Sequence, residues 1–248
     1  MSVRLLVDWV VGLAPDGWAL GLRLATGLAL SVLIALVGYR RQYLSRTGLY
    51  GAIAVGTLIF GLGGWAWGLL LVTFFVTSSV LSHFRAGRKQ AVADYFAKTG
   101  RRDLGQVVAN GGLGVLLAAW FALSGGTSLL LFFAFAGGIA AVTADTWATE
   151  LGILSREKPH LITTGEVVEA GTSGAISWLG VVASLAGAWL IGFLGLALWL
   201  ARGWLSGVPQ DGRLGCLPLV AALGGLAGSL VDSLLGATLQ ATYYCPLC

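Results

Sequence analysis

The stretch from residue 128 to residue 150, SLLLFFAFAGGIAAVTADTWATE, decides the class of fold. A helix needs about 20 mostly apolar residues to cross a membrane, and this stretch supplies nearly that many before its only charges, Asp145 and Glu150. The sequence therefore predicts an all-α, polytopic transmembrane helical bundle of six to seven spans, forming a single integral membrane domain over residues 1–248. The expected spans are 18–38, 48–61, 64–82, 105–123, 128–150, 172–201 and 214–240.

The composition of the whole chain excludes most soluble classes. Of the 248 residues 57% are hydrophobic and only 10% are charged, whereas soluble domains carry roughly 25% charged residues. Glycine is abundant, with 38 residues, and we interpret it as close packing between helices. The net charge of +4 is explained by membrane orientation, so we expect membrane lipids as partners and no nucleic acid.

The basic residues predict the orientation of the chain in the membrane. Loops 39–47, 83–103 and 151–171 hold three, six and two of the fifteen Lys and Arg residues. They share one side if residues 48–82 cross twice, and the positive-inside rule makes that side cytoplasmic. A single crossing there would separate the first loop from the others. Because Asp8 and Asp16 interrupt the N-terminal segment, we expect an uncleaved signal anchor rather than a signal peptide.

Three acidic residues, Asp145, Glu150 and Asp232, lie within or at the end of apolar runs. An acid at the centre of a span costs about 3 kcal/mol on insertion scales, so it normally has a partner or a function. Small residues one turn away, such as Gly228 and Gly236, predict that the aspartates face the bundle interior. We expect the three carboxylates to hold Mg²⁺, with the helix end unwound or bridged by Asp232. Hydrogen bonding between helices is the alternative for each acid alone.

A second polar cluster opens the run that follows. We expect Thr172 or Ser173 to cap a helix, flanked by Gly171 and Gly174, and the free N–H groups of that helix start to bind phosphate. An ordinary capped helix is the alternative, but the adjacent metal site favours phosphate.

The basic loop and the span after it supply further candidates. Arg101 and Arg102 suit bidentate phosphate binding, or alternatively anionic lipid. Asn110 is polar where lipid-facing residues are apolar, so we expect it to line the same cavity. We expect His83 and His160 to be solvated.

These segments resemble a membrane family, the domain-of-unknown-function-92 or transmembrane-protein-19 group, which includes plant phytyl-phosphate kinases. The resemblance covers residues 102–240 in order, with a weaker match over 39–82. It rests on ADTWATELG at 144–152, LITTG at 161–165, GTSGAIS at 171–177, DSLLGATLQ at 232–240, and residues 102–103 with 106–112.

The resemblance implies a prenyl-phosphate kinase that converts phytyl or geranylgeranyl monophosphate to the diphosphate, with Mg²⁺ and CTP or another nucleoside triphosphate as donor. Carried over to this sequence, Asp145, Glu150 and Asp232 are the catalytic, metal-binding residues. The implied phosphate-binding residues are Arg101, Arg102, Asn110, Thr164, Gly171, Thr172, Ser173 and Gly174.

One feature departs from the family, and two other functions stay open. The family pattern continues past Cys245 and Cys248 with further Cys and His residues, so the expectation is a truncated chain or a member without that segment. These two cysteines alone are half of a tetrahedral ligand set and cannot close around zinc without two more ligands. A cation- or proton-coupled transporter and a non-catalytic membrane scaffold are the alternatives to the kinase. Acids at the cytoplasmic third, beside a phosphate-type helix start, favour the enzyme.

Overall fold

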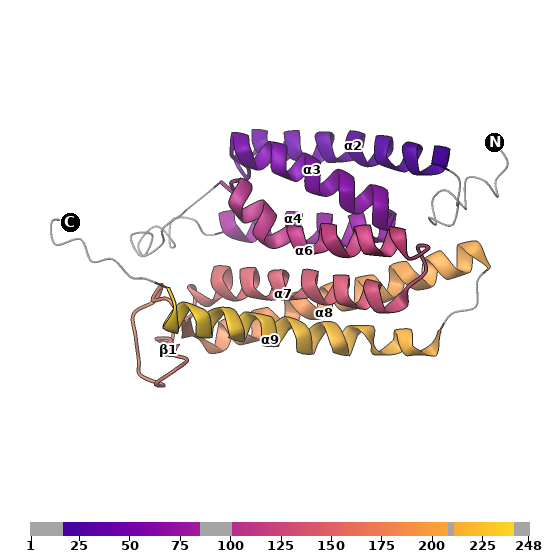
Figure 1. Ribbon diagram of the computed structural model, residues 1–248. Helices are drawn as coiled ribbons and strands as arrows, with labels where there is room; N and C mark the ends of the chain where they lie inside the picture. The colour runs from indigo at the N-terminus through magenta and orange to yellow at the C-terminus, as the bar shows by residue number, and fades with distance from the viewer. Residues whose placement is uncertain (1–16, 85–100, 208–210, 241–248) are drawn as a thin grey trace.

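A computed structural model describes residues 17–84, 101–207 and 211–240. Seven of its helices are long and apolar enough to cross a membrane, which confirms the predicted all-α transmembrane bundle (Figure 1). They are α2 (Gly17–Arg40), α3 (Arg46–Gly63), α4 (Trp65–His83), α6 (Leu104–Leu123), α7 (Leu129–Gly152), α8 (Trp178–Ser206) and α9 (Leu217–Thr238), joined by the 3₁₀ turn η2 (Gly212–Cys216) and the paired strands β1 (His160–Leu161) and β2 (Ala175–Ile176).

The helices begin and end within three residues of the expected spans except at the two ends of α8, which ends at Ser206, five residues after the expected end. This helix begins at Trp178, six residues after the predicted start, because residues 175–176 pair with β1 instead. Its N-cap is Ser177, whose side-chain oxygen accepts a hydrogen bond from the Gly180 N–H at 3.1 Å. The prediction that Thr172 or Ser173 caps this helix is therefore wrong.

The helices α3 and α4 form two separate crossings. Only Gly64 lies between them, with a φ of 91° that favours glycine, so the chain reverses abruptly there. As a result the α2–α3 connection, the end of α4, the start of α6 and the α7–α8 connection all lie at one end of the bundle, on the left of Figure 1. The described parts of the three basic loops share this end, which we call the loop end; residues 85–100 lie outside the described residues.

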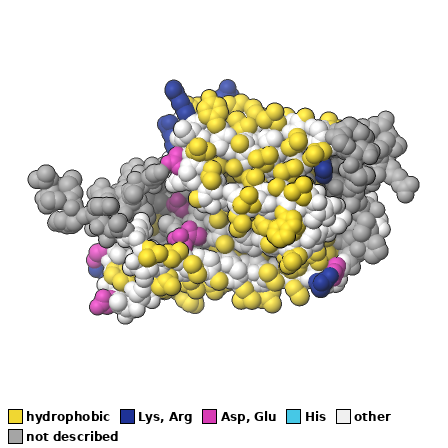
Figure 2. Space-filling view, viewed as in Figure 1, with side chains coloured by type: hydrophobic (Ala, Val, Ile, Leu, Met, Phe, Trp, Pro, Cys, Tyr) yellow, Lys and Arg dark blue, Asp and Glu magenta, His cyan; other side chains and the backbone are white. Residues whose placement is uncertain are grey.

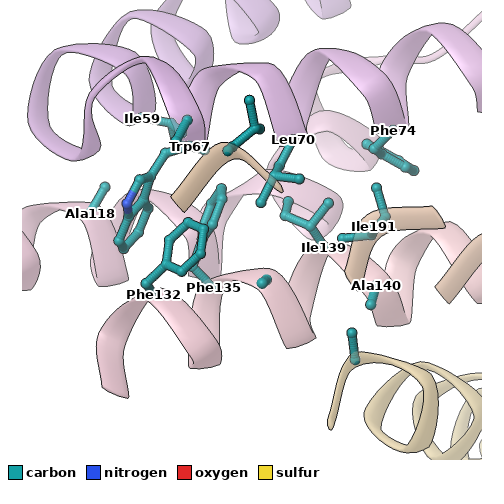
Figure 3. Close-up of a cluster of buried hydrophobic side chains, with 14 of the residues drawn as sticks. Ile59, Trp67, Leu70, Phe74, Ala118, Phe132, Phe135, Ile139, Ala140 and Ile191 are labelled. Carbon is teal, nitrogen blue, oxygen red and sulfur yellow. The ribbon is translucent and has the colours of Figure 1, made fainter. Parts of the chain in front are cut away.

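The hydrophobic core joins the two halves of the bundle. Trp67 of α4 stacks on Phe135 of α7 with ring centroids 4.2 Å apart, and Phe121 of α6 lies 4.9 Å from the same indole. Figure 3 shows this aromatic centre flanked by aliphatic residues of α3 and α8, including Ile59 and Ile191. The helix α7 thus packs on α4 and α6 on one side and on α8 and α9 on the other.

The outer surface is apolar, as a lipid-facing surface must be. Leucines such as Leu123 (88% exposed) and Leu130 (79% exposed) point away from the bundle. Figure 2 shows hydrophobic side chains over the middle of the visible face, with most of the charged side chains toward its two ends.

Glycine allows the helices to approach closely, and this can be tested on α9. A Cβ on Gly225 would lie 2.5 Å from the Cβ of Ala188 and 3.1 Å from the carbonyl oxygen of Ala140. Gly225→Ala is therefore expected to lower the free energy of unfolding by about 1–3 kcal/mol, measured by thermal unfolding in detergent. The matched control is Gly224→Ala, where a Cβ meets nothing within 4 Å and stability should stay equal or rise. Equal destabilisation by both would contradict the packing argument.

Candidate functional site

A cavity of about 250 Å³ lies at the loop end, between α7, α8 and α9. Its walls are the last turns of α7, the first turns of α8, the second half of α9 and the segment 170–177 that precedes α8. The polar side chains on these walls include Asp145, Thr149, Thr172, Ser173, Ser184, Ser229, Asp232 and Ser233.

Two carboxylates face each other across this cavity. Asp145 comes from α7 and Asp232 from α9, and their side chains are close enough to share a hydrogen bond. Asp145 is half-buried and Asp232 is exposed. A Cβ on Gly228 would lie 2.7 Å from the Cβ of Ala141, so glycine brings α9 close to α7 just before Asp232. The two helices thereby place like charges together, which is favourable only with a proton or a cation between them.

The segment 170–177 is fastened to the end of α9. The Ser173 hydroxyl is placed to donate to the Gly236 carbonyl oxygen at 3.0 Å and to the Gln240 side-chain oxygen at 2.5 Å. Gly171 and Gly174 have φ values of 93° and 78°, in the region that favours glycine. The predicted residues Gly171, Thr172, Ser173 and Gly174 thus line the cavity beside the carboxylates.

This wall also offers groups that bind anions. The positive end of the α8 dipole lies here, since Ser177 and Gly180 line the cavity. Among the described residues, the backbone N–H groups of Ser173 and Gly174 donate no hydrogen bond. Anion-binding donors and two carboxylates together suit Mg²⁺, which takes one or two protein carboxylates and completes its shell with water and phosphate oxygens.

Ser184 also lines this cavity, although the sequence did not mark it as a candidate. Its side chain is 1% exposed, and its hydroxyl has no hydrogen-bond partner among the described residues. A buried hydroxyl without a partner is costly, so its place on the cavity wall points to a ligand or water. Its position seven residues after Ser177, two turns along the same helix face, was the available signal.

The structure does not bring Glu150 to the two aspartates, which corrects the expected site of three carboxylates. The helix α7 continues to Gly152, so its end does not unwind. Glu150 instead accepts a hydrogen bond from the Ser82 hydroxyl at 2.6 Å and interacts with the charge of Arg102. Within residues 17–84, 101–207 and 211–240, no group of three or more His, Cys, Asp or Glu is placed to hold a metal ion. Among the described residues, the carboxylates that line the cavity are therefore those of Asp145 and Asp232.

The remaining predicted phosphate ligands also lie elsewhere. We call the cavity lined by Asp145 and Asp232 the aspartate cavity. Arg102 and Asn110 line a different cavity, so the expectation that Asn110 lines the aspartate cavity is wrong. Arg101 is exposed and does not line the aspartate cavity. Thr164 is exposed, and its hydroxyl donates to Glu166 at 3.2 Å. The two histidines are exposed as expected, with the ring of His83 lying 4.6 Å from that of Tyr43.

The attachment of segment 170–177 to α9 can be tested at Gly174. A Cβ there would lie 2.7 Å from the Cα of Ala237 and would also require an unfavourable positive φ. Gly174→Ala is expected to cost about 1–3 kcal/mol of stability and to expose the segment to limited proteolysis. Gly165→Ala is the matched control, because Gly165 has a φ of 73° but nothing within 4 Å of its Cβ. If both variants are cleaved equally, contact with α9 does not hold the segment.

Comparisons with known proteins agree with this architecture. The family described as "Integral membrane protein DUF92" matches residues 29–248. Protein PGR of Arabidopsis thaliana is 36% identical over 235 residues, covering 90% of this chain and 81% of its own length. An uncharacterized membrane protein of Methanocaldococcus jannaschii is 36% identical over 219 residues, covering 88% and 84%.

A more distant relative and the solved structures complete the comparison. Protein VTE6, chloroplastic, of Arabidopsis thaliana is 27% identical over 151 residues, which are 60% of this chain and 45% of the relative. No solved structure matches the chain. The match to the family over most of the chain, with the predicted helices in place, shows that the chain belongs to the DUF92 family of integral membrane proteins.

Proposed function

We propose that this protein is a prenyl-phosphate kinase of the membrane. It transfers the terminal phosphoryl group of CTP or another nucleoside triphosphate to phytyl or geranylgeranyl monophosphate, with Mg²⁺ as cofactor and the loop end in the cytoplasm. The observation that carries the proposal is the pair Asp145 and Asp232, facing each other beside the anion-binding segment 170–177. The resemblance to a family that includes phytyl-phosphate kinases supports it.

The reaction needs positioning and charge neutralisation more than acid–base chemistry. An oxygen of the acceptor monophosphate attacks the γ-phosphorus, the bond from that phosphorus to the β–γ bridging oxygen breaks, and the nucleoside diphosphate leaves. Because the attacking oxygen is already anionic, no strong general base is required. Mg²⁺ would supply neutralisation of the phosphate charge, held by Asp145 and Asp232. Thr172, Ser173 and the N–H groups of this segment would orient the phosphates.

The size of the cavity limits what it encloses. Its volume of about 250 Å³ lies below the usual range of about 300–1,000 Å³ for whole-ligand pockets. It therefore suits an ion and phosphate groups rather than a complete nucleotide or a prenyl chain. The hydrocarbon of the acceptor would remain among the lipids that contact the exposed apolar faces of α8 and α9.

The proposal is tested with purified protein, Mg²⁺, γ-labelled CTP or ATP, and phytyl or geranylgeranyl monophosphate. We expect labelled prenyl diphosphate with at least one donor, and its loss when EDTA removes the divalent ion. Absence of product with every nucleoside triphosphate and both acceptors would overturn the kinase.

A transporter is the second candidate, because facing carboxylates in a helical bundle also suit a bound proton or cation. Its test uses the same protein in liposomes. A proton or cation flux that is lost in Asp145→Asn, together with absence of kinase product, would favour transport.

A further inference from the structure

A second hollow lies among α2, α3 and α4, in the half of the bundle away from the aspartate cavity. It consists of two cavities, of about 80 Å³ and 360 Å³, that share walls from all three helices. We call the two together the α2–α4 groove. The shared wall residues are Ser31, Ile34, Gly56, Leu71 and Val72.

The groove is open to the membrane. The helix α2 packs mainly on α3, which leaves a space between α2 and α4. Leu30 of α2 and Leu69 of α4 both line this space, yet they are 44% and 37% exposed. Side chains that line a hollow and are also exposed on the outer face of a membrane bundle lie at an opening toward lipid.

A positively charged side chain, that of Arg102, lies at the loop end of the groove. Arg102 lines it beside Asn110, and its guanidinium carbon lies 5.3 Å from the ring centroid of Phe74. Its Nη1 donates a long hydrogen bond, 3.4 Å, to the Ser79 hydroxyl, while Glu150 of α7 supplies a nearby negative charge. The far end has Arg23, which is half-buried. The rest of the lining is almost entirely apolar, so the groove matches a hydrocarbon chain with an anionic group at its end.

We propose that the α2–α4 groove binds one hydrocarbon chain of an anionic membrane phospholipid, with the headgroup phosphate at Arg102. The groove and the aspartate cavity share no lining residue, so the lipid in the groove is not in position to react there. The lipid instead fills the space between α2 and α4. The lipid proposal does not depend on the proposed kinase activity, because its test measures lipid binding and not turnover.

The test is native mass spectrometry of the full chain in detergent, with phosphatidylglycerol and phosphatidylcholine of the same acyl chains. The wild type should retain one phosphatidylglycerol in preference to phosphatidylcholine. Val72→Phe, which fills the groove, should lose this lipid, whereas Val76→Phe on the exposed side of α4 should keep it. Arg102→Gln should weaken the preference for phosphatidylglycerol about tenfold or more, as loss of a charged hydrogen bond predicts, and Arg101→Gln should not.

Four results would overturn the proposal. Equal retention of both phospholipids by the wild type removes the role of Arg102. Equal effects of Val72→Phe and Val76→Phe mean that the retained lipid lies outside the groove. A loss of the preference for phosphatidylglycerol in Arg23→Gln but not in Arg102→Gln places the headgroup at the other end of the groove. Displacement of phosphatidylglycerol by geranylgeranyl monophosphate in the wild type, but no geranylgeranyl monophosphate binding to Val72→Phe, would assign the groove to the kinase acceptor instead.

Discussion

Asp145→Asn and Asp232→Asn are each expected to lower the rate of prenyl diphosphate formation by about 10²–10³-fold, the usual effect of removing one group that stabilises transition-state charge. Each variant keeps the shape of the side chain but removes one of the two negative charges that face each other in the cavity between α7, α8 and α9. With one carboxylate left, the proposed Mg²⁺ would lose one of its two expected carboxylate ligands. The measurement is the initial rate as a function of Mg²⁺ concentration, and the curves should shift to higher concentrations.

Glu150→Gln is the control that distinguishes a site of two carboxylates, as seen in the structure, from the site of three carboxylates predicted from the sequence. Glu150 lies on the same helix as Asp145, but it accepts a hydrogen bond from Ser82 and does not line the cavity. We expect its rate to fall less than roughly tenfold, since an amide oxygen still accepts the Ser82 hydrogen bond, at a typical cost near 1 kcal/mol. A loss as large as that of the aspartate variants, in protein that elutes normally on size exclusion, would restore the site of three carboxylates.

Hydropathy predicted the transmembrane helices well because length and apolar content alone decide whether a helix can cross. It failed at the start of α8, where residues 171–177 are small and weakly polar and so have the composition of a helix start. Their actual conformation depends on tertiary contacts: β2 pairs with β1, and Ser173 bonds to the end of α9, 63 residues away along the chain. No local pattern predicts such contacts.

The candidate site was likewise predicted only in part from the local sequence. Asp145 and Asp232 were found because a carboxylate within an apolar span is costly and therefore conspicuous. Their pairing was supported by Gly228 and Gly236, and both glycines do allow close contacts, with Ala141 and Ser173. Glu150 was placed wrongly because five residues turn a helix by about 140° from Asp145, and α7 stays helical.

A serine within a transmembrane span does not by itself predict a ligand site, because hydroxyls in helices usually donate a hydrogen bond to a carbonyl of the preceding turn. Thr143 and Thr146 of α7 do so, at 2.6 Å and 2.8 Å from Ile139 and Val142. Ser184 forms no such bond within the described part of the chain. Its spacing from Ser177 places it on the same face of α8, but only the structure shows that its hydroxyl has no partner among the described residues.

Ser184→Ala is therefore expected to weaken kinase activity without weakening the fold. Loss of a hydrogen bond to a charged phosphate or to water on the metal costs about 1.5–3 kcal/mol, which is a fall of about 10–150-fold in kcat/KM. Stability should stay equal or rise, because the variant removes a buried hydroxyl that has no protein partner. The measurements are steady-state kinetics with Mg²⁺ and the nucleotide, and thermal unfolding without ligand.

Ser78→Ala is the matched control. Ser78 is also fully buried and its hydroxyl also lacks a partner among the described residues, but it lies on α4 and does not line the aspartate cavity. Both variants should therefore have the same effect on unfolding, and only Ser184→Ala should lower kcat/KM. If the two are kinetically alike, the free hydroxyl of Ser184 is a packing feature of α8 and the ligand contacts of the cavity come from α7, α9 and segment 170–177. A loss of activity confined to Ser184→Ala would place the bound phosphates deep between the helices, because Ser184 lies almost two turns inside α8 from its N-cap.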